Sequence, residues 1–268
     1  MFPVDLTGRT GLILGVANKR SLAWGIAQAL SRAGMRLVLT YQGERLGAGV
    51  RELAAELPGS LVLPCDVADD SQIEALFARV REETPRLDAC VHSIAFAQKE
   101  DLAGAYRDTT REGWRVALEI SAFSLVAIMK HATPMMQAPA GDEGQPPGRG
   151  GSVLALSYMA AERAVPNYNV MGSAKAALEH AVRQLAFELG PMGIRVNCIS
   201  AGPISTLSAR GVGSFTEMLK HHREKAPLRR NVTAEEVGLG GLFLLSDLGS
   251  GVTGETLHVD AGYSIVGW

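Results

Sequence analysis

The chain has 268 residues, of which 47% are hydrophobic, so it can bury the core of one large α/β domain or of two small ones. Its formal net charge of −2 excludes a protein whose whole surface is built to hold nucleic acid. Its three cysteines each lie in or beside a short apolar run, which indicates buried, reduced thiols, and no CxxC or HxxxH spacing occurs, so we expect no metal site.

The chain begins with MFPVDLTGRTG, which lacks the basic start and the long apolar stretch of a signal peptide. No apolar run reaches the ~20 residues that a membrane-spanning helix needs. We therefore expect a cytoplasmic protein without membrane insertion.

Short apolar runs alternate with helical patterns along the chain. The predicted strands are 10–15, 36–41, 60–65, 87–93, 151–157, 194–200 and 255–260. The predicted helices between them are 21–34, 44–59, 70–84, about 110–136 and 169–189. Strands without polar alternation, separated by helices, indicate a parallel sheet that is covered on both faces. The fold class is thus α/β, a Rossmann-type doubly wound sheet with right-handed crossovers, in a single domain that spans residues 1–268.

Two segments interrupt this alternation. Residues 138–151 are rich in proline and glycine, cannot form a helix, and are expected to be a surface loop before the fifth strand. A long connection, 201–213, follows the sixth strand. Ligands of doubly wound sheets lie at the carboxyl ends of the strands, so we interpret the segment near 201–230 as lid-like. The alternative is an ordinary surface connection.

The loop after the first strand, GVANKRSLAWG, opens the first helix. Its two glycines, Gly15 and Gly25, do not satisfy the strict G-x-G-x-x-G pattern of dinucleotide-binding loops. The physical requirements can still be met: Gly15 gives a tight turn, and Ser21 can cap the helix and offer its hydroxyl to a phosphate. Gly25 would let the helix lie close to the ligand or the sheet. The alternative is a plain glycine turn.

Polar side chains follow the second and third strands. Gln42 stands where an acid normally reads the cofactor ribose, and a neutral amide does not attract a 2′-phosphate, which favours NADH over NADPH. Arg45 could instead recruit that phosphate. Asp66 can accept a hydrogen bond from the adenine amino group, and Val67 can pack on the ring. The alternative is that Asp66 caps the next helix, a role for which Asp69 competes.

The predicted helix 169–189 carries a candidate reactive pair. Lys175 should bind the nicotinamide ribose and supply positive charge. Tyr168 lies seven residues earlier, on nearly the same face but ~10.5 Å away along the axis, whereas a spacing of four gives ~6 Å. A tyrosine four before the lysine would suit ketone reduction, because the carbon that accepts hydride then carries the oxygen that needs the proton. Met171 occupies that position.

The longer spacing suits the reduction of a double bond conjugated to a thioester. Hydride then reaches the β-carbon, and negative charge develops on the carbonyl oxygen, three bonds away, where a displaced phenol can stabilise it. Tyr158 ends the fifth strand as a second phenol on the crevice side. Ser157, just before it, lies near the catalytic serine of carbonyl-reducing proteins. His92, at the end of the fourth strand, is expected to be structural.

Other functions remain open at this point. A carbonyl or alcohol oxidoreductase of the same fold would need a tyrosine in place of Met171. A non-catalytic dinucleotide sensor would keep the cofactor loop but lose the phenol or the lysine, and both are present. The structural alternative is that Tyr168 is a packed aromatic residue and Lys175 a solvated base.

With these residues in place, the chain resembles the short-chain dehydrogenase/reductase superfamily and, more closely, the bacterial NADH-dependent enoyl-acyl carrier protein reductases. The resemblance runs from about Leu6 to the last strand and includes TYQ, CDVA, HSIAFA, RVNCISAGPISTL and HVDAGYS. Its specific part is the Tyr-x6-Lys pair within AERAVPNYNVMGSAK, since the other motifs belong to the wider superfamily.

The resemblance implies reduction of the trans-2 double bond of enoyl thioesters with NADH, the last reduction of each cycle of type II fatty-acid elongation. It implies a homotetramer that acts on chains carried by acyl carrier protein. Tyr168 and Lys175 would be the active pair, Tyr158 a second active-site phenol, and Ala97 a contact of the acyl substrate. The residues that it assigns to NAD are Gly15, Ser21, Leu22, Gln42, Asp66, Val67, Ile94, Lys175, Ile204, Ser205, Thr206, Leu207 and Ser208.

Two further features bear on substrates and partners. Ala95 stands where glycine is common in this family, which could narrow the pocket. Basic residues cluster in 220–231, KHHREKAPLRRN, and could steer an acidic carrier protein. The alternative is a solvated helix face.

Overall fold

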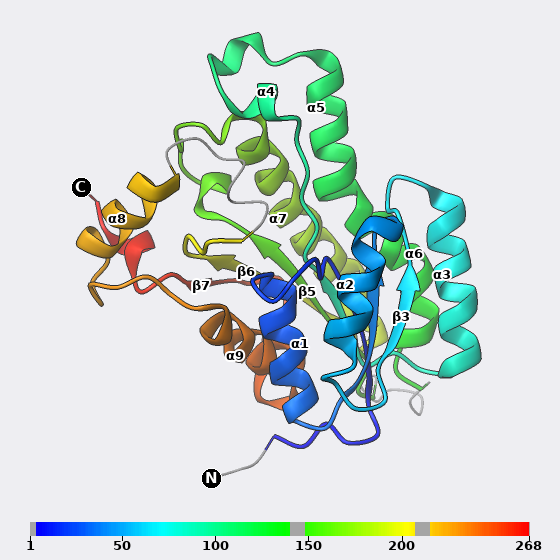
Figure 1. Cartoon of the computed structure of the whole chain (residues 1–268). Coiled ribbons are helices and arrows are strands. Elements are labelled where there is room, and N and C mark those ends of the chain that lie inside the picture. Colours follow the sequence, from blue (N-terminus) through cyan, green and yellow to red (C-terminus); the bar gives the residue numbers. More distant parts are fainter. Residues whose placement is uncertain (1–3, 140–147, 207–214, 268) are drawn as a thin grey trace.

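The computed structural model describes residues 4–139, 148–206 and 215–267, which form one sheet covered by helices (Figure 1). The seven strands are all parallel and lie in the order β3-β2-β1-β4-β5-β6-β7. This confirms the predicted doubly wound α/β fold. The strands are β1 Thr10–Leu14, β2 Arg36–Tyr41, β3 Leu61–Pro64, β4 Ala89–His92, β5 Ser152–Ser157, β6 Arg195–Ala201 and β7 Thr256–Val259.

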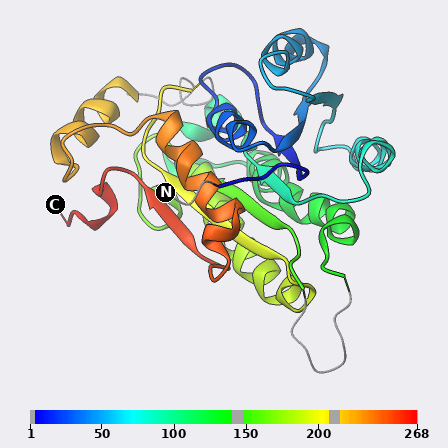
Figure 2. The same ribbon diagram turned by 90° about the horizontal axis from the view of Figure 1, so that it is seen from below.

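Two apolar layers cover the sheet because its strands are apolar on both faces. One layer packs α1, α2 and α9 on the sheet, and the other packs α3, α6 and α7. Figure 2 shows the helices on both sides of the strands. The helices are α1 Leu22–Arg32, α2 Glu44–Ala54, α3 Asp70–Glu83, α4 Lys99–Leu102, α5 Arg111–Leu118, α6 Ser124–Met136, α7 Asn169–Leu189, α8 Phe215–Lys225 and α9 Ala234–Leu245.

The sequence patterns predicted some of these helices correctly and missed others. The bounds of α7 agree with the predicted helix 169–189. The long helix expected over 110–136 is present but is divided into α5 and α6 by a π-helical turn, Glu119–Phe123. Helices α8 and α9, which follow β6, were not predicted.

The stretch Arg111–Met136 is, within the described part of the chain, the one helical segment long and apolar enough to cross a membrane. Core helices of globular proteins pass the same test, and 44% of its apolar window is buried. The α6 portion contributes Leu125, Ile128 and Met136 to the core beneath the sheet. Burial in this core accounts for its apolar composition.

The first helix packs on α9 through glycine, not on a ligand or on the sheet as expected for Gly25. A Cβ added at Gly25 would lie 2.2 Å from the carbonyl oxygen of Ala234. One added at Gly238 would lie 2.4 Å from the carbonyl oxygen of Gly25. The two backbones therefore touch, and side chains at these positions would force the helices apart.

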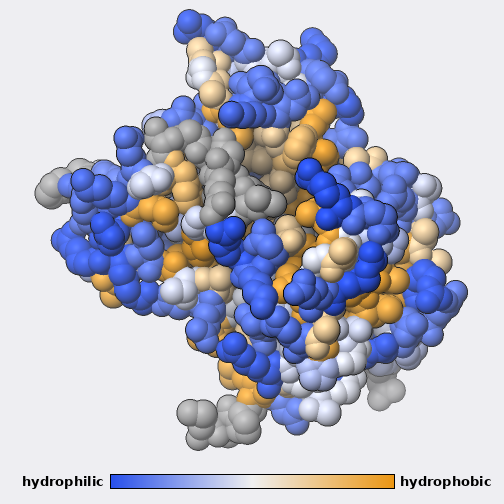
Figure 3. Space-filling model, viewed as in Figure 1, coloured by the Kyte–Doolittle hydropathy of each residue, from blue (hydrophilic) through white to orange (hydrophobic). Residues whose placement is uncertain are grey.

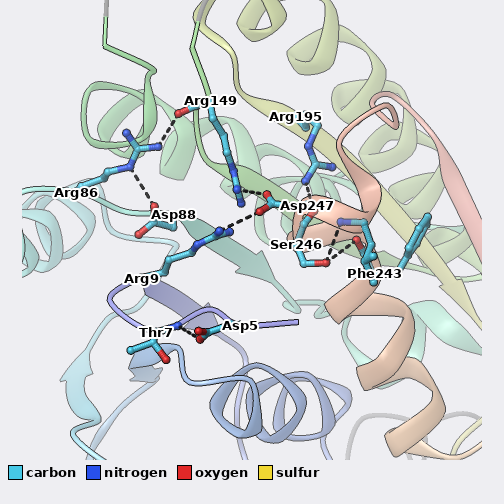
Figure 4. Close-up of polar contacts among 11 residues, drawn as sticks. Asp5, Thr7, Arg9, Arg86, Asp88, Arg149, Arg195, Phe243, Ser246 and Asp247 are labelled. Atoms are coloured by element: carbon cyan, nitrogen blue, oxygen red, sulfur yellow. Dashed lines mark hydrogen bonds and ion pairs between the residues drawn. The ribbon is translucent and has the colours of Figure 1, made fainter. Parts of the chain in front are cut away.

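Arginine side chains tie the loops together at the amino edge of the sheet, as Figure 4 shows. Asp247 accepts from Arg9, at 3.0 Å, and from Arg149. Arg86 donates to Asp88, 3.0 Å away, and to the carbonyl oxygen of Arg149, 2.7 Å away. The described end of the proline- and glycine-rich segment is thus held at the edge opposite the strands' carboxyl ends. Residues 140–147, within the predicted loop, lie outside the described part of the chain.

We expect Gly25→Ala to destabilise the protein by about 1–3 kcal/mol, because the added methyl group overlaps backbone atoms of α9. Urea unfolding measures the change. Gly49→Ala, in α2, is the matched control: nothing lies within 4 Å of its added Cβ, and alanine should stabilise the helix by about 0.5–1 kcal/mol. Equal stability of the two variants would contradict the close α1–α9 contact.

Candidate active site

The carboxyl ends of β1, β4, β5 and β6 surround a cavity of about 380 Å³. Figure 3 shows apolar surface on this side of the molecule, below α4 and α5. The cavity brings together residues from the cofactor loop, the fourth-strand motif, the reactive pair and the lid-like segment. Its lining includes Gly15, Ser21, Leu22, Ile94, Ala95, Ala97, Tyr158, Tyr168, Met171, Lys175, Ile204, Thr206, Phe215 and Met218.

The loop after β1 makes the tight turn that the sequence predicts. Gly15 has φ +100°, and a Cβ there would lie 2.0 Å from the carbonyl oxygen of Ser93. Glycine is required for both reasons. Ser21 occupies the N-cap position of α1, but its side chain does not cap the helix. Its hydroxyl instead accepts from the backbone N–H groups of Ala17 and Asn18, at 3.0 and 3.1 Å, and fixes the loop.

Gln42 and Asp66 meet at the ends of β2 and β3. The Gln42 amide donates to one carboxylate oxygen of Asp66 at 3.0 Å, and the other oxygen accepts from the N–H of Ala68. Asp69, not Asp66, caps α3 by accepting from the N–H of Ser71. This decides the competition for the cap and leaves Asp66 at the strand end. Gln42, Asp66 and Val67 do not line the described cavity but lie at the same edge of the sheet.

Lys175 lies two turns into α7 and is only 5% exposed. Its ammonium group donates to the carbonyl oxygen of Leu156, the next-to-last residue of β5, at 2.6 Å. Burial lowers the pKa of Lys175 to about 8, while the neighbouring Cys198 and Glu179 act in the opposite direction. A lysine in this environment changes its charge close to neutral pH, unlike a solvated lysine.

Two phenols stand beside the lysine. Tyr168 is the residue directly before α7, and its ring centroid lies 5.0 Å from that of Tyr158. Burial raises the pKa of Tyr158 to about 12, and burial followed by the proximity of Tyr158 raises the pKa of Tyr168. Both phenols therefore keep their protons at neutral pH and can donate. Tyr158 donates to the sulfur of Met218, from α8, at 3.2 Å.

The side chains of His92 and Ser157 are hydrogen-bonded to other protein groups, which leaves neither a direct chemical role. His92 is fully buried with Nε2 2.7 Å from the hydroxyl of Ser124, and burial lowers its pKa to about 3, so it stays neutral as a structural residue. The Ser157 hydroxyl donates to the carboxylate of Glu179 at 2.6 Å. Sequence reasoning missed Glu179. An acid on the apolar face of α7, one turn after Lys175, was the available signal.

The lid-like segment borders the cavity from two sides. Ile204 and Thr206 line it after β6, whereas Ser205 is exposed. Phe215 and Met218 of α8, further along the segment, also line it. Leu207 and Ser208, which were expected to contact NAD, lie outside the described residues.

Comparison with known proteins identifies the family. The family described as enoyl-(acyl carrier protein) reductase matches residues 15–264. The chain belongs to this family. It is 52% identical to an NADH-dependent enoyl-acyl carrier protein reductase of Bacillus cereus, over 98% of this chain and 99% of the relative. It is 48% identical to the corresponding Escherichia coli protein, over 97% of this chain and 95% of the relative.

Solved structures of this reductase family have the same fold. A Bacillus cereus reductase crystallised with NADP+ and an indole naphthyridinone superposes with a TM-score of 0.92, at 52% identity, over 98% of this chain and 99% of that one. A reductase of Anaplasma phagocytophilum in complex with NAD superposes with a TM-score of 0.91, at 45% identity, over 98% of this chain and 96% of that one. The family resemblance stated from the Tyr-x6-Lys pair is confirmed.

The burial of Lys175 has a measurable consequence for this reductase family member. Its pKa is lower in the folded protein, about 8, than its ordinary value of 10.5, so the unfolded chain binds more protons between these values. Stability therefore rises with pH across this window. Relative to Lys175→Met, the wild-type protein should gain about 2 kcal/mol of unfolding free energy between pH 7 and pH 9.5. Urea unfolding at both pH values measures the difference, and a constant difference would contradict a buried ammonium group.

Proposed function

We propose that the protein is an NADH-dependent enoyl-acyl carrier protein reductase, which reduces the trans-2 double bond of enoyl thioesters in the last reduction of type II fatty-acid elongation. The observation that carries this proposal is the pair Tyr168 and Lys175 at one cavity, with Met171 buried at the position that a ketone reductase would give to tyrosine. The relatives named above are NADH-dependent enoyl reductases over nearly the full length of this chain.

The cofactor loop fits a dinucleotide. The turn at Gly15 has no room for a Cβ, and the loop is held by Ser21 at the start of α1, where backbone N–H groups favour a pyrophosphate. Gln42, Asp66 and Val67 would hold the adenosine end, and Lys175, Ile94 and residues 204–208 the nicotinamide end. When bound, NADH supplies the hydride.

The protein residues stabilise charge where the reaction develops it. When the β-carbon of the substrate accepts hydride, its thioester oxygen becomes negative, and the Tyr168 phenol donates a hydrogen bond to that oxygen. The raised pKa of Tyr168 keeps the phenol protonated for this role. The ammonium of Lys175 adds positive charge and binds the ribose. Tyr158, whose ring packs on Tyr168, limits the positions that this phenol can take.

Apolar residues on both sides of the cavity suit an acyl chain. Ala97, Met171 and Phe215 contribute apolar surface beside the two phenols. Ala95 also lines the cavity. We expect its methyl group, in place of the glycine common in the family, to narrow the cavity. These side chains exclude water from the reacting thioester, which strengthens the hydrogen bond from Tyr168.

A carbonyl or alcohol oxidoreductase is the alternative. It would require a tyrosine at position 171 and a serine hydroxyl free to donate to the substrate carbonyl. Met171 has no proton to give, and the Ser157 proton is donated to Glu179. Both observations favour the enoyl reductase.

NADH absorbance with a crotonyl thioester tests the proposal. We expect NADH consumption with the crotonyl substrate and none with the corresponding ketoacyl thioester. Consumption with the ketoacyl substrate alone would establish the alternative, and consumption with neither would leave a non-catalytic dinucleotide-binding protein. A parallel measurement with NADPH should give a lower kcat/KM, because Gln42 offers no positive charge to a 2′-phosphate.

The two members of the reactive pair should differ in their contribution. Lys175→Ala removes both ribose binding and positive charge, whereas a water molecule can replace part of the hydrogen bond lost in Tyr168→Phe. We expect Tyr168→Phe to lower kcat/KM by about 10²-fold at most. Lys175→Ala should lower it further and also weaken NADH binding, measured by NADH fluorescence. Unchanged NADH affinity in Lys175→Ala would contradict the ribose contact.

The segment near 201–230 is proposed to act as a lid, since Ile204 and Thr206 at its start and Phe215 near its middle border the cavity. Amide hydrogen exchange at Ile204, Ser205 and Thr206 should slow when NAD and an acyl analogue are added together, because ordering protects backbone amides. Exchange rates in β5 are the internal control. Equal protection of 204–206 with and without ligands would rule out the lid.

The partners of the proposed reaction follow from the substrate. An enoyl chain carried by acyl carrier protein, a homotetramer and a cytoplasmic location are part of the proposal. The basic segment 220–231 is a candidate docking surface, although part of its charge is engaged: Lys220 pairs with Glu224, and Arg230 with Glu236. These pairs favour a modest role in steering the acidic carrier.

A further inference from the structure

A buried carboxylate lies one turn beyond Lys175. Glu179 is 5% exposed, on the face of α7 that packs against β5 and β6. Burying a carboxylate is costly unless hydrogen bonds or charges compensate it. The Ser157 hydroxyl supplies one such bond, at 2.6 Å. The proposed chemistry gives no direct role to either residue.

Two consecutive hydrogen bonds join α7 to the end of β5. Lys175 donates to the carbonyl oxygen of Leu156, and the next residue, Ser157, donates to Glu179, both at 2.6 Å. Lys175 and Glu179 stand on successive turns of one helix face. Tyr158 follows directly in the chain. The two bonds therefore fix the strand end from which this phenol projects and the helix that carries the lysine.

The groups around Lys175 leave Glu179 as the source of negative charge. Of the described residues that act on the lysine, His92 in β4 is neutral, and burial raises the pKa of Cys198 in β6 to about 12. The Tyr158 and Tyr168 phenols are protonated at neutral pH as well. Glu179 alone among these groups is an acid of low intrinsic pKa.

The surroundings of Glu179 compensate its charge only in part. Burial raises its pKa, and Glu162, which follows β5, acts in the same direction. The hydrogen bond from Ser157, second only to burial and larger than the effect of Glu162, lowers the pKa, as do Arg183 on the next turn of α7 and His258 in β7. The hydroxyl of Ser157 thus favours the carboxylate form, whose charge in turn favours the ammonium form of Lys175.

We propose that Glu179, held by Ser157, is a positioning residue of the active site that keeps Lys175 charged at the nicotinamide ribose. Ser157 lies near the position of the catalytic serine of carbonyl-reducing proteins. In this proposal it acts on Lys175 through Glu179 and does not contact the substrate. This inference rests on the proposed NADH-dependent reduction, because the charge on Lys175 matters there for binding the cofactor.

The test compares Glu179→Gln with Glu188→Gln, which removes the same charge from an exposed position of α7. Pulse acetylation with acetic anhydride across a pH series, read at Lys175 by peptide mass spectrometry, reports the pKa of this amine in the cofactor-free protein. We expect Glu179→Gln to lower the Lys175 pKa by about one pH unit. Glu188→Gln should leave it at the wild-type value.

NADH affinity gives an independent readout. The Kd of Glu179→Gln should equal that of the wild type at pH 6, where the lysine is charged in both, and be about fivefold weaker at pH 8. Ser157→Ala should shift both readouts in the same direction, and it serves as the second variant if Glu179→Gln does not fold. A Lys175 pKa unchanged in the folded variants would overturn the inference, even where their thermal stability falls.

Wild-type activity separates the two proposals. A wild-type protein that consumes no NADH with enoyl thioester would overturn the proposed function. A wild-type protein that is active, with variants whose Lys175 pKa and pH-dependent NADH affinity match its own, would overturn the role of Glu179 alone.

Discussion

The hydrogen bond from the buried ammonium group of Lys175 to the carbonyl oxygen of Leu156 is the interaction on which the proposed active site depends. Burying an ammonium group is unfavourable unless hydrogen bonds compensate for the lost water, and the carbonyl oxygen of Leu156 supplies one such bond. The carbonyl that receives it belongs to the end of a parallel strand, where the sheet directs every carboxyl end to one edge. Tyr158 directly follows β5, and Tyr168 directly precedes α7, the helix that carries Lys175.

The opposite edges of the sheet serve different purposes. Ion pairs among Arg9, Arg149 and Asp247 join the loops at the amino edge, and none of these three residues lines the described cavity. The carboxyl edge keeps an apolar cavity with few charged side chains, of which Lys175 is the most buried.

Local signals predicted much of the fold and the candidate site. The apolar strand runs and the periodicity of 169–189 place β5 and α7 correctly, and Gly15 occupies the positive-φ turn that its place in the chain requires. The spacing of Tyr168 and Lys175 predicts both the family and their meeting at one cavity. These features depend on residues that are close in the sequence.

Contacts between distant segments could not be predicted in this way. Gly25 packs on α9, more than two hundred residues later in the chain, so the expectation that it lies close to a ligand or to the sheet was wrong. Ser21 bonds backward to its own loop, a choice set by the turn's geometry. The bond from Ser157 to Glu179 depends on the register of α7 against β5, which no local pattern specifies. The π-helical turn Glu119–Phe123 after α5 was likewise not predicted.

The backbone contact between α1 and α9 also defines what the lid-like segment can do. Its first end leaves β6 within the sheet, and its second end enters α9 through the Thr233 capping box, on a helix that touches the cofactor-loop helix without intervening side chains. If the segment acts as the proposed lid, both of its flanking elements, β6 and α9, are fixed in the fold, so opening would have to come from bending between them.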